Sequence, residues 1–230
     1  MSNVLIPNNI ATVLDRVRLA AQKSQRSPED ICIVAASKTR CAAAIKIAYQ
    51  CGIRNFGENY LQEALEKITT LADLDIVWHF IGPIQSNKTR AIAEHFDWVH
   101  SVGRLKIARR LSEARPEHLS PLKVCLQVNI SAEASKSGVT PQQLPKLVDE
   151  IKDLPGIELR GLMAIPAATS DEELQRRTFR TMCELMEQQQ VKVPGMDTLS
   201  MGMSADLEAA ITQGSNLIRV GTDIFGARSR

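Results

Sequence analysis

Lys38 is the residue best suited to covalent chemistry. It ends an almost continuous apolar run, ICIVAAS, at positions 31–37. A lysine at the end of a buried strand is partly removed from water, and this burial lowers the pKa of its ammonium group. The free amine can then form an imine with a carbonyl compound. A solvated lysine at a strand end is the alternative, and position alone does not separate the two.

Two turns near the C-terminus have the composition of a phosphate site. They are SMGMS, at 200–204, and RVGTDIFGAR, at 219–228. Small residues let backbone N–H groups approach a dianion, and the hydroxyls of Ser204 and Thr222 can donate hydrogen bonds to it. Ser204 also suits the N-cap of a helix that begins at Ala205, so ordinary turn and capping chemistry is the alternative. Nucleotide binding by a P-loop is excluded, because Lys-Ser/Thr does not follow the glycines.

Arg219 lies inside the apolar run LIRVG, where an unpaired guanidinium would be costly. It needs a specific partner, either a pyridine nitrogen that accepts a hydrogen bond or a carboxylate on a neighbouring strand. Asn59, in FGEN, ends another predicted strand and could contact a ligand or cap the next helix. His79 lies in the middle of a predicted strand, where a hydrogen-bonded core role is expected.

Composition excludes several other classes of site. The four histidines show no ligand spacing with Cys, Asp or Glu, so no metal site is predicted. The five cysteines are widely spaced without a CxxC pair and are predicted to be reduced. A net charge of +2, spread along the chain, argues against nucleic acid as a partner. No apolar run approaches the roughly 18 residues that span a bilayer, and the N-terminus lacks a signal sequence, so we expect a cytoplasmic protein without membrane partners.

The elements that must position these residues alternate in type. Short runs rich in β-branched residues predict eight strands: Ile31–Ser37, Asn55–Gly57, Ile76–Gly82, Trp98–Val102, Lys123–Ile130, Glu158–Ile165, Thr198–Met201 and Leu217–Val220. Amphipathic segments between them predict helices at Ala42–Gln50, Leu61–Leu71, Asn87–His95, Leu105–Ala114, Gln142–Lys152, Glu172–Gln190 and Ala205–Thr212. An extra N-terminal helix, Ile10–Gln22, precedes the first strand and is expected to cap the barrel floor.

This order is typical of an α/β protein built as a single (β/α)8 TIM barrel, with residues 1–230 forming one domain. The candidate residues follow the predicted strands directly, and barrels place their sites at the C-terminal ends of strands. A doubly wound open sheet is the structural alternative, because element order alone does not close a barrel.

Six segments occur in order from about Ile31 to the C-terminus: SKT, FGEN, WHFIGPIQSNK, GLMAIP, LSMGMS and IRVGTDIFGAR. Together they resemble the pyridoxal phosphate homeostasis proteins. The resemblance implies an alanine-racemase-like barrel that holds pyridoxal 5′-phosphate (PLP) as a Schiff base on Lys38. It further implies that Ser204, Gly221 and Thr222 hold the phosphate, that Arg219 faces the pyridine nitrogen, and that Asn59 and Met201 lie against the cofactor.

The resulting hypothesis is a PLP-binding protein of intracellular PLP and amino-acid/keto-acid homeostasis, with no robust catalysis and no catalytic residue. An arginine cannot protonate the pyridine nitrogen, so the electron sink is weak. The chain ends soon after Arg219, so we expect neither the second domain of racemases nor its tyrosine, and we expect a monomer. The alternatives are a small amino-acid racemase and a phosphate-binding isomerase or lyase in which Lys38 forms an imine with a sugar phosphate.

Overall fold

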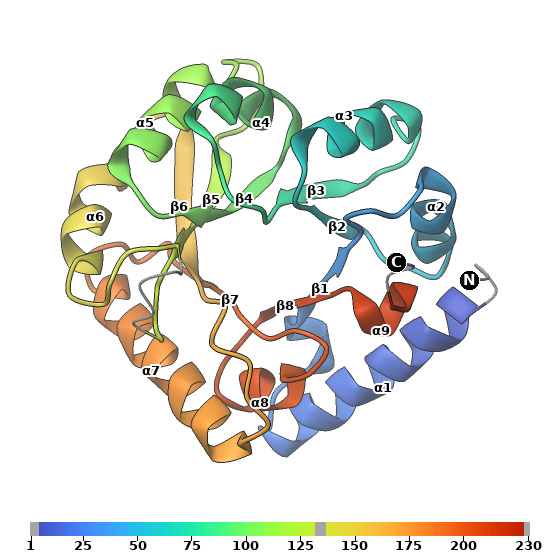
Figure 1. The fold of residues 1–230 in the computed structure, drawn as a ribbon. Helices are drawn as coiled ribbons and strands as arrows, with labels where there is room; N and C mark the ends of the chain where they lie inside the picture. The colour runs from blue at the N-terminus through green and yellow to red at the C-terminus, as the bar shows by residue number, and fades with distance from the viewer. Residues whose placement is uncertain (1–4, 132–136, 228–230) are drawn as a thin grey trace.

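Eight parallel strands close a barrel in chain order, β1 to β8 (Figure 1). The computed structural model describes residues 5–131 and 137–227. The strands are β1 (Cys32–Ala36), β2 (Asn55–Glu58), β3 (Val77–Phe80), β4 (Trp98–Val102), β5 (Leu122–Gln127), β6 (Ile157–Met163), β7 (Thr198–Ser200) and β8 (Leu217–Val220). Pairing of β1 with β8 closes the sheet, which confirms the barrel and rules out the open sheet.

Helices follow the strands and surround the barrel (Figure 1). They are α2 (Ala42–Gln50), α3 (Leu61–Thr70), α4 (Thr89–His95), α5 (Leu105–Ala114), α6 (Leu144–Ile151), α7 (Glu172–Gln190), α8 (Leu207–Thr212) and α9 (Thr222–Phe225). Two short 3-10 helices, η2 (Pro28–Asp30) and η3 (Ser86–Lys88), precede β1 and α4. The expected helix start at Ala205 was wrong: α8 begins at Leu207 with Asp206 at its N-cap, so Ser204 belongs to the preceding turn.

The leading helix α1 (Ile6–Lys23) lies in the outer ring of helices. It packs against α8 and α9 on one side and against α2 on the other, as Figure 1 shows. The expectation that it caps the barrel floor was therefore wrong. The face that α1 turns inward is apolar, and Ile6, Ile10, Val13 and Val17 on it join the hydrophobic core.

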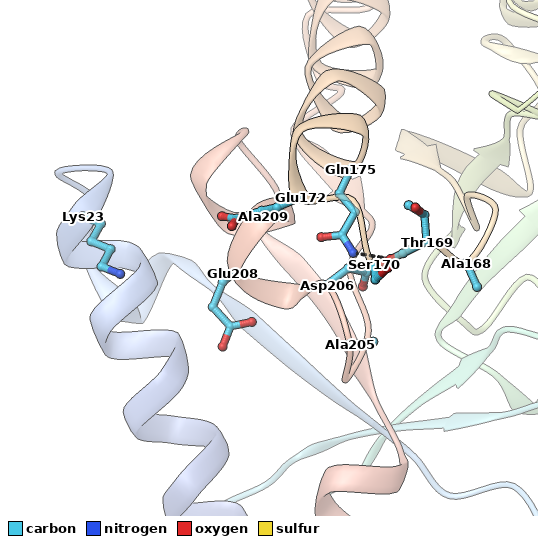
Figure 2. Close-up of a pocket in the computed structure, with 10 residues that line it drawn as sticks. All are labelled: Lys23, Ala168, Thr169, Ser170, Glu172, Gln175, Ala205, Asp206, Glu208 and Ala209. Carbon is cyan, nitrogen blue, oxygen red and sulfur yellow. Dashed lines mark hydrogen bonds between the residues drawn. The ribbon is translucent and has the colours of Figure 1, made fainter.

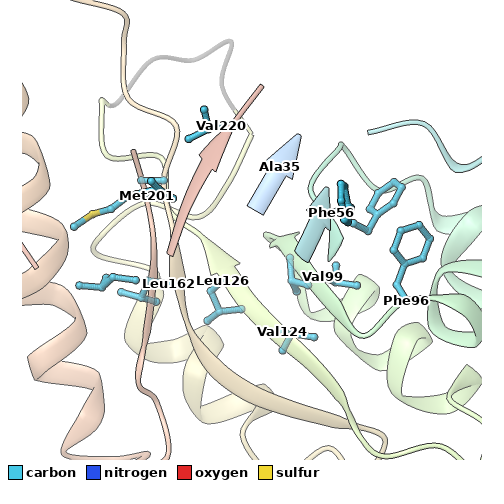
Figure 3. Packing of buried hydrophobic residues seen from close by; sticks show 14 of the residues in the cluster. Ala35, Phe56, Phe96, Val99, Val124, Leu126, Leu162, Met201 and Val220 are labelled. Atoms are coloured by element: carbon cyan, nitrogen blue, oxygen red, sulfur yellow. The ribbon is translucent and has the colours of Figure 1, made fainter. Parts of the chain in front are cut away.

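The layer between the strands and the surrounding helices forms one apolar core (Figure 3). Strand residues such as Val99, Val124 and Leu126 have no exposed surface, because alternate side chains on each strand point to the two sides of the sheet and both sides are covered. Full burial of such a side chain contributes about 1.5–3 kcal/mol. This close-packed frame holds the strand ends at fixed positions.

None of the helices in residues 5–131 and 137–227 is long and apolar enough to cross a membrane.

Candidate functional site

A cavity of about 280 Å³ opens at the C-terminal ends of the strands. Six of the seven residues predicted for the site line it: Lys38, Asn59, Ser204, Arg219, Gly221 and Thr222. These six come from four βα units that are far apart in sequence, so the closure of the barrel brings them together. The remaining wall is mostly apolar and is formed by Ala36, Ile81, Ile165, Met203, Ala205 and the partly buried Arg40.

Met201, the seventh residue, is not part of this wall. Its side chain has no exposed surface and packs in the hydrophobic core, and Met203 lines the cavity instead. In an extended chain, residues two apart point to the same side, so Met203 would join Met201 in the core if β7 continued straight. The turn at Gly202 changes that direction and brings Met203 into the cavity wall. Gly202 has φ +95°, and a Cβ there would lie 2.6 Å from the Cβ of Ala210. The turn therefore requires glycine.

Lys38 is half-buried and stands at a sharp turn after β1. The amide of Arg40 donates back to the carbonyl of Ser37 at 3.0 Å, so the chain reverses around Lys38 and Thr39. Thr39 has φ +63°, a left-handed conformation that costs a residue with a Cβ of order 1 kcal/mol. Its N–H donates to Oε2 of Glu63 on α3 at 3.1 Å, which helps to hold the turn.

A buried ion pair lies directly beneath this turn. Nζ of Lys67 contacts both carboxylate oxygens of Glu58, at 2.8 and 2.9 Å, and donates to the carbonyl of Ser37 at 3.0 Å. The hydroxyl of Ser37 donates to Oε1 of Glu58 at 2.6 Å. Burial raises the pKa of Glu58, and the bonds from Lys67 and Ser37 oppose that rise. The ion pair thus connects Ser37, the residue before Lys38, to Glu58, the residue before Asn59.

The two C-terminal turns present hydrogen-bond donors without protein acceptors. In the part of the chain that the structure describes, no acceptor is found for the backbone N–H groups of Ser204, Ala205 and Gly221. The hydroxyl oxygen of Ser204 accepts a bond of 3.3 Å from the amide of Asp223, so its own proton stays available. A Cβ on Gly221 would lie 3.3 Å from the carbonyl oxygen of Ala36, which leaves little room for a larger residue.

Arg219 is 5% exposed. It belongs to β8, and its side chain lines the cavity. Its Nη1 donates to the carbonyl and the hydroxyl of Ser200, both at 2.6 Å, and its Nη2 donates to the carbonyl of Ala164 at 2.9 Å. Among the described residues no carboxylate pairs with it, so the carboxylate alternative was wrong. Burial lowers the pKa of Arg219 to about 10, which leaves it charged at neutral pH. Its Nε–H lacks a described acceptor and can serve a ligand atom.

A chain of buried hydrogen bonds continues from Arg219 across the barrel. Nδ1 of His100 meets the hydroxyl of Ser200 at 2.7 Å, and Nε2 of His100 meets Nδ1 of His79 at 2.9 Å. Nε2 of His79 meets Oδ1 of Asn55 at 3.0 Å. Since Oδ1 only accepts, both rings donate through Nε2 and accept at Nδ1, and Ser200 donates to His100.

Burial keeps both histidines of this chain neutral. It lowers the pKa of His79 to about 3 and the pKa of His100 well below its usual value of 6.5. The predicted core role of His79 is therefore confirmed. The sequence did not predict its contact with His100 or the link to Arg219, because these residues lie on separate strands. The usable signal was that His79 and His100 both occur in apolar strand runs.

The unpaired groups of the cavity fit PLP. Oδ1 of Asn59 is buried and has no hydrogen-bond partner. The free amides and hydroxyls of the two turns suit a phosphate dianion, and the spare Nε–H of Arg219 suits an acceptor such as a pyridine nitrogen. Lys38 supplies an amine in the same cavity, and the apolar wall suits a flat ring.

Other depressions lack this combination of groups. A larger one, of about 800 Å³, lies outside the barrel between Lys23 of α1, the start of α7 and α8 (Figure 2). It contains none of the predicted site residues, so size does not identify the site. A cavity of about 250 Å³ at the opposite end of the barrel is lined by His79 and Asn55. Within the described ranges, no group of three or more His, Cys, Asp or Glu side chains is placed to hold a metal ion.

Comparison with known proteins finds one family model and many relatives. Residues 9–229 match the model of the alanine racemase N-terminal domain. The pyridoxal phosphate homeostasis protein of Pseudomonas aeruginosa is 58% identical over 223 residues, which cover 97% of this chain and 96% of that protein. The structure of PipY from Synechococcus elongatus with PLP bound superposes with a TM-score of 0.80 at 38% identity, over 92% of this chain and 99% of that one.

An alanine racemase of Clostridium difficile shares the fold at 13% identity, with a TM-score of 0.76. The match covers 97% of this chain but 58% of the racemase. It therefore supports the alanine-racemase-like barrel.

Proposed function

The chain belongs to the pyridoxal phosphate homeostasis protein family, and we propose that it binds PLP covalently through Lys38 at the barrel mouth. The observation that carries this proposal is the meeting of Lys38 with unpaired donors of Ser204, Ala205 and Gly221 in one cavity. When bound, PLP supplies an aldehyde that condenses with an amine, and a dianionic phosphate. We propose further that residues 1–230 act as one domain.

Each polar group of the cavity has a distinct part in the proposal. The turns at Ser204 and at Gly221–Thr222 hold the phosphate through N–H and O–H groups. Arg219 donates to the pyridine nitrogen, and it keeps that nitrogen unprotonated because a guanidinium does not act as an acid at neutral pH. Asn59 lies against the ring and gains a partner for its buried Oδ1. Met201 supports this wall from the core rather than by touching the cofactor.

We propose that the protein takes part in intracellular homeostasis of PLP and of amino and keto acids, and does not turn over a substrate robustly. Among the described residues that line the cavity, the ionisable side chains are Lys38, Arg40 and Arg219. Proton transfer on both sides of a substrate carbon needs a second acid or base near pKa 7, and the two guanidiniums do not meet that need. The relatives carry a homeostasis name rather than the name of a reaction, which supports the same view.

An adjoining cavity offers room for amino acids as second ligands. It has a volume of about 300 Å³ and shares Asn59, Ile81 and Ile165 with the cofactor cavity. Its other wall includes Ser101 and Gln127, which are polar and uncharged. A small amine could therefore reach the carbon attached to Lys38. Among the described residues of its wall, no side chain is suited to transfer a proton near neutral pH, which fits exchange of the cofactor better than racemisation.

One absorption experiment tests the proposal. Purified protein incubated with PLP should show a visible band, and borohydride reduction should leave a mass increase on Lys38. Lys38→Ala should lose both signals, whereas Lys46→Ala, an exposed lysine on α2, should keep them. A colourless wild-type protein, or a fixed cofactor in Lys38→Ala, would contradict the proposal. Sustained turnover of either enantiomer of an amino-acid panel, lost in Lys38→Ala, would replace the homeostasis function with racemase activity.

A further inference from the structure

Arg16 on α1 joins the two turns that line the phosphate end of the cavity. Its Nη2 donates to the backbone carbonyl of Ser204 at 2.9 Å. Its Nη1 donates to the carboxylate of Asp223, the residue after Thr222. A helix that precedes the barrel in sequence thus contacts both loops that follow its last two strands, and Figure 1 shows α1 beside α8 and α9.

Glu208 holds the same guanidinium in place. Nε of Arg16 lies 2.6 Å from Oε1 of Glu208, and Nη2 lies 2.8 Å from Oε2. This paired geometry fixes the plane of the guanidinium as well as its distance. The hydrogen bond that Arg16 donates to Glu208 also raises the pKa of Arg16, so the guanidinium keeps its charge. The Arg16 side chain is 28% exposed, so these contacts are only partly screened by water.

The contact to the Ser204 carbonyl has a direct consequence for the cavity. In a trans peptide the C=O and the following N–H point in opposite directions. The bond to Arg16 turns the Ser204 carbonyl towards α1, so the N–H of Ala205 points away from α1. Ala205 lines the cavity, and its N–H has no acceptor among the described residues. Arg16 therefore orients the Ala205 N–H, which is one of the unpaired donors at the proposed phosphate site.

The second contact sets the distance between the turns. Asp223 also donates its backbone N–H to the hydroxyl oxygen of Ser204 at 3.3 Å, a long bond. Arg16 bridges the same two segments with charged hydrogen bonds, which are about twice as strong as neutral ones. A second helix contact, from Nδ2 of Asn9 to the carbonyl of Ile224 at 3.0 Å, holds α9 against α1.

We propose that Arg16 is a positioning residue for the cofactor phosphate, so that the leading helix is part of the binding site without touching the ligand. The proposal rests on the proposed function, because it assigns the two turns to the phosphate of PLP. It makes a prediction that a general packing role does not make. Loss of Arg16 should weaken a ligand that carries the phosphate and spare the same aldehyde without it.

The experiment compares PLP with pyridoxal, which has the same aldehyde and ring but no phosphate. Both are titrated by absorbance into wild type, Arg16→Ala and the matched control Arg18→Ala. Arg18 lies on the same helix and has only long, exposed contacts to Gln22 and Asp15, at 3.4 and 3.5 Å. Arg16→Ala should raise the Kd for PLP about tenfold, the effect of one lost bond to a charged group, and change the Kd for pyridoxal less than about twofold. Arg18→Ala should change neither.

Equal weakening of both aldehydes, or no change for PLP, would overturn the proposal. If pyridoxal binds too weakly to titrate, inorganic phosphate competing with PLP replaces it: a raised inhibition constant in Arg16→Ala supports the proposal and an unchanged one overturns it. If Arg16→Ala does not fold, Glu208→Gln weakens the anchor while Arg16 remains, and the same selectivity for PLP is expected. A wild-type protein that binds neither aldehyde would instead overturn the proposed function, and the present inference with it.

Discussion

The mouth of the barrel and its interior both contain polar groups, but within the described residues the polar chain of the interior is fully paired, whereas several groups at the mouth are not. Inside, the chain from Arg219 through Ser200, His100 and His79 ends at Asn55 with a partner at each step. At the mouth, the amides of Ser204, Ala205 and Gly221 and the Oδ1 of Asn59 have no partner in the described residues. Of these groups the Oδ1 of Asn59 is buried, where an unpaired polar atom is costly, and the three amides are donors that a polar ligand in the same cavity can use.

The comparison predicts that changes in the interior affect stability and that changes at the mouth affect binding. Arg219 belongs to both regions, because its Nη groups bond to residues of the interior and its side chain also lines the cavity.

Breaking the buried ion pair should have the largest effect. Lys67→Met leaves the carboxylate of Glu58, which has no exposed surface, without its charged partner. We expect a loss of about 3 kcal/mol in the free energy of unfolding, measured by urea denaturation without ligand. The double variant Glu58→Gln/Lys67→Met should recover much of that loss. Lys46→Met, at an exposed position of α2, should cost nothing measurable, and a Lys67→Met protein as stable as wild type would contradict a stabilising role of this buried ion pair.

Removal of PLP should lower the free energy of unfolding only through the loss of contacts at the barrel mouth. PLP at a hundredfold excess over its Kd should raise the free energy of unfolding by about 2.7 kcal/mol, because it binds the folded chain. Lys38→Ala should lose most of this gain while keeping the stability of the ligand-free protein, since Lys38 is only half-buried. Thermal unfolding with and without PLP measures both quantities. A large loss of ligand-free stability in Lys38→Ala would place this lysine in the paired interior instead.

Acid should destabilise the interior through its two histidines. Their pKa values in the folded chain lie below the usual 6.5, so between about pH 6.5 and pH 3 the unfolded chain binds more protons than the folded one. Stability is therefore complete above pH 6.5 and falls as the pH drops. From pH 7 to pH 5 His79 should account for about 2 kcal/mol, and His100 should act in the same direction. His100→Gln should make this pH dependence shallower, and exposed His118→Gln should leave it unchanged; equal slopes for the two variants would refute the assignment.

Substitutions of two serines test the difference between the interior and the mouth with the smallest expected effects. Ser215 is buried and donates its hydroxyl among the carbonyls of Leu199, Met201 and Leu217, at 3.1, 2.7 and 3.2 Å. Ser215→Ala should cost about 1 kcal/mol of stability and leave the Kd for PLP within about twofold. Ser204→Ala should cost less than about 0.5 kcal/mol and raise the Kd for PLP about tenfold. Denaturation and PLP titration of both variants test the contrast, and a reversed pattern would break it.

Much of this arrangement was readable from local sequence. The strands Trp98–Val102 and Leu217–Val220 and the helices Ala42–Gln50, Leu105–Ala114 and Glu172–Gln190 have the predicted bounds. Element ends beside the mouth differ more, as at α8, where the carboxylate of Asp206 accepts from the amide of Met203 and delays the helix. Lys38 and the two turns were found because a barrel places its site after its strands, and that rule needs only the order of elements.

The partners of those residues could not be read in the same way. A charged residue in an apolar strand signalled a buried contact for Arg219, but its acceptors, Ser200 on β7 and Ala164 just after β6, depend on how the barrel closes. The place of α1, the link between His79 and His100, and the bridge from Arg16 to Asp223 likewise join residues that are distant in the chain. Periodicity and residue type specify which groups need burial or pairing, because those are local properties. Which group meets which is set by the closed sheet and the helices packed around it, because these contacts form only between distant segments.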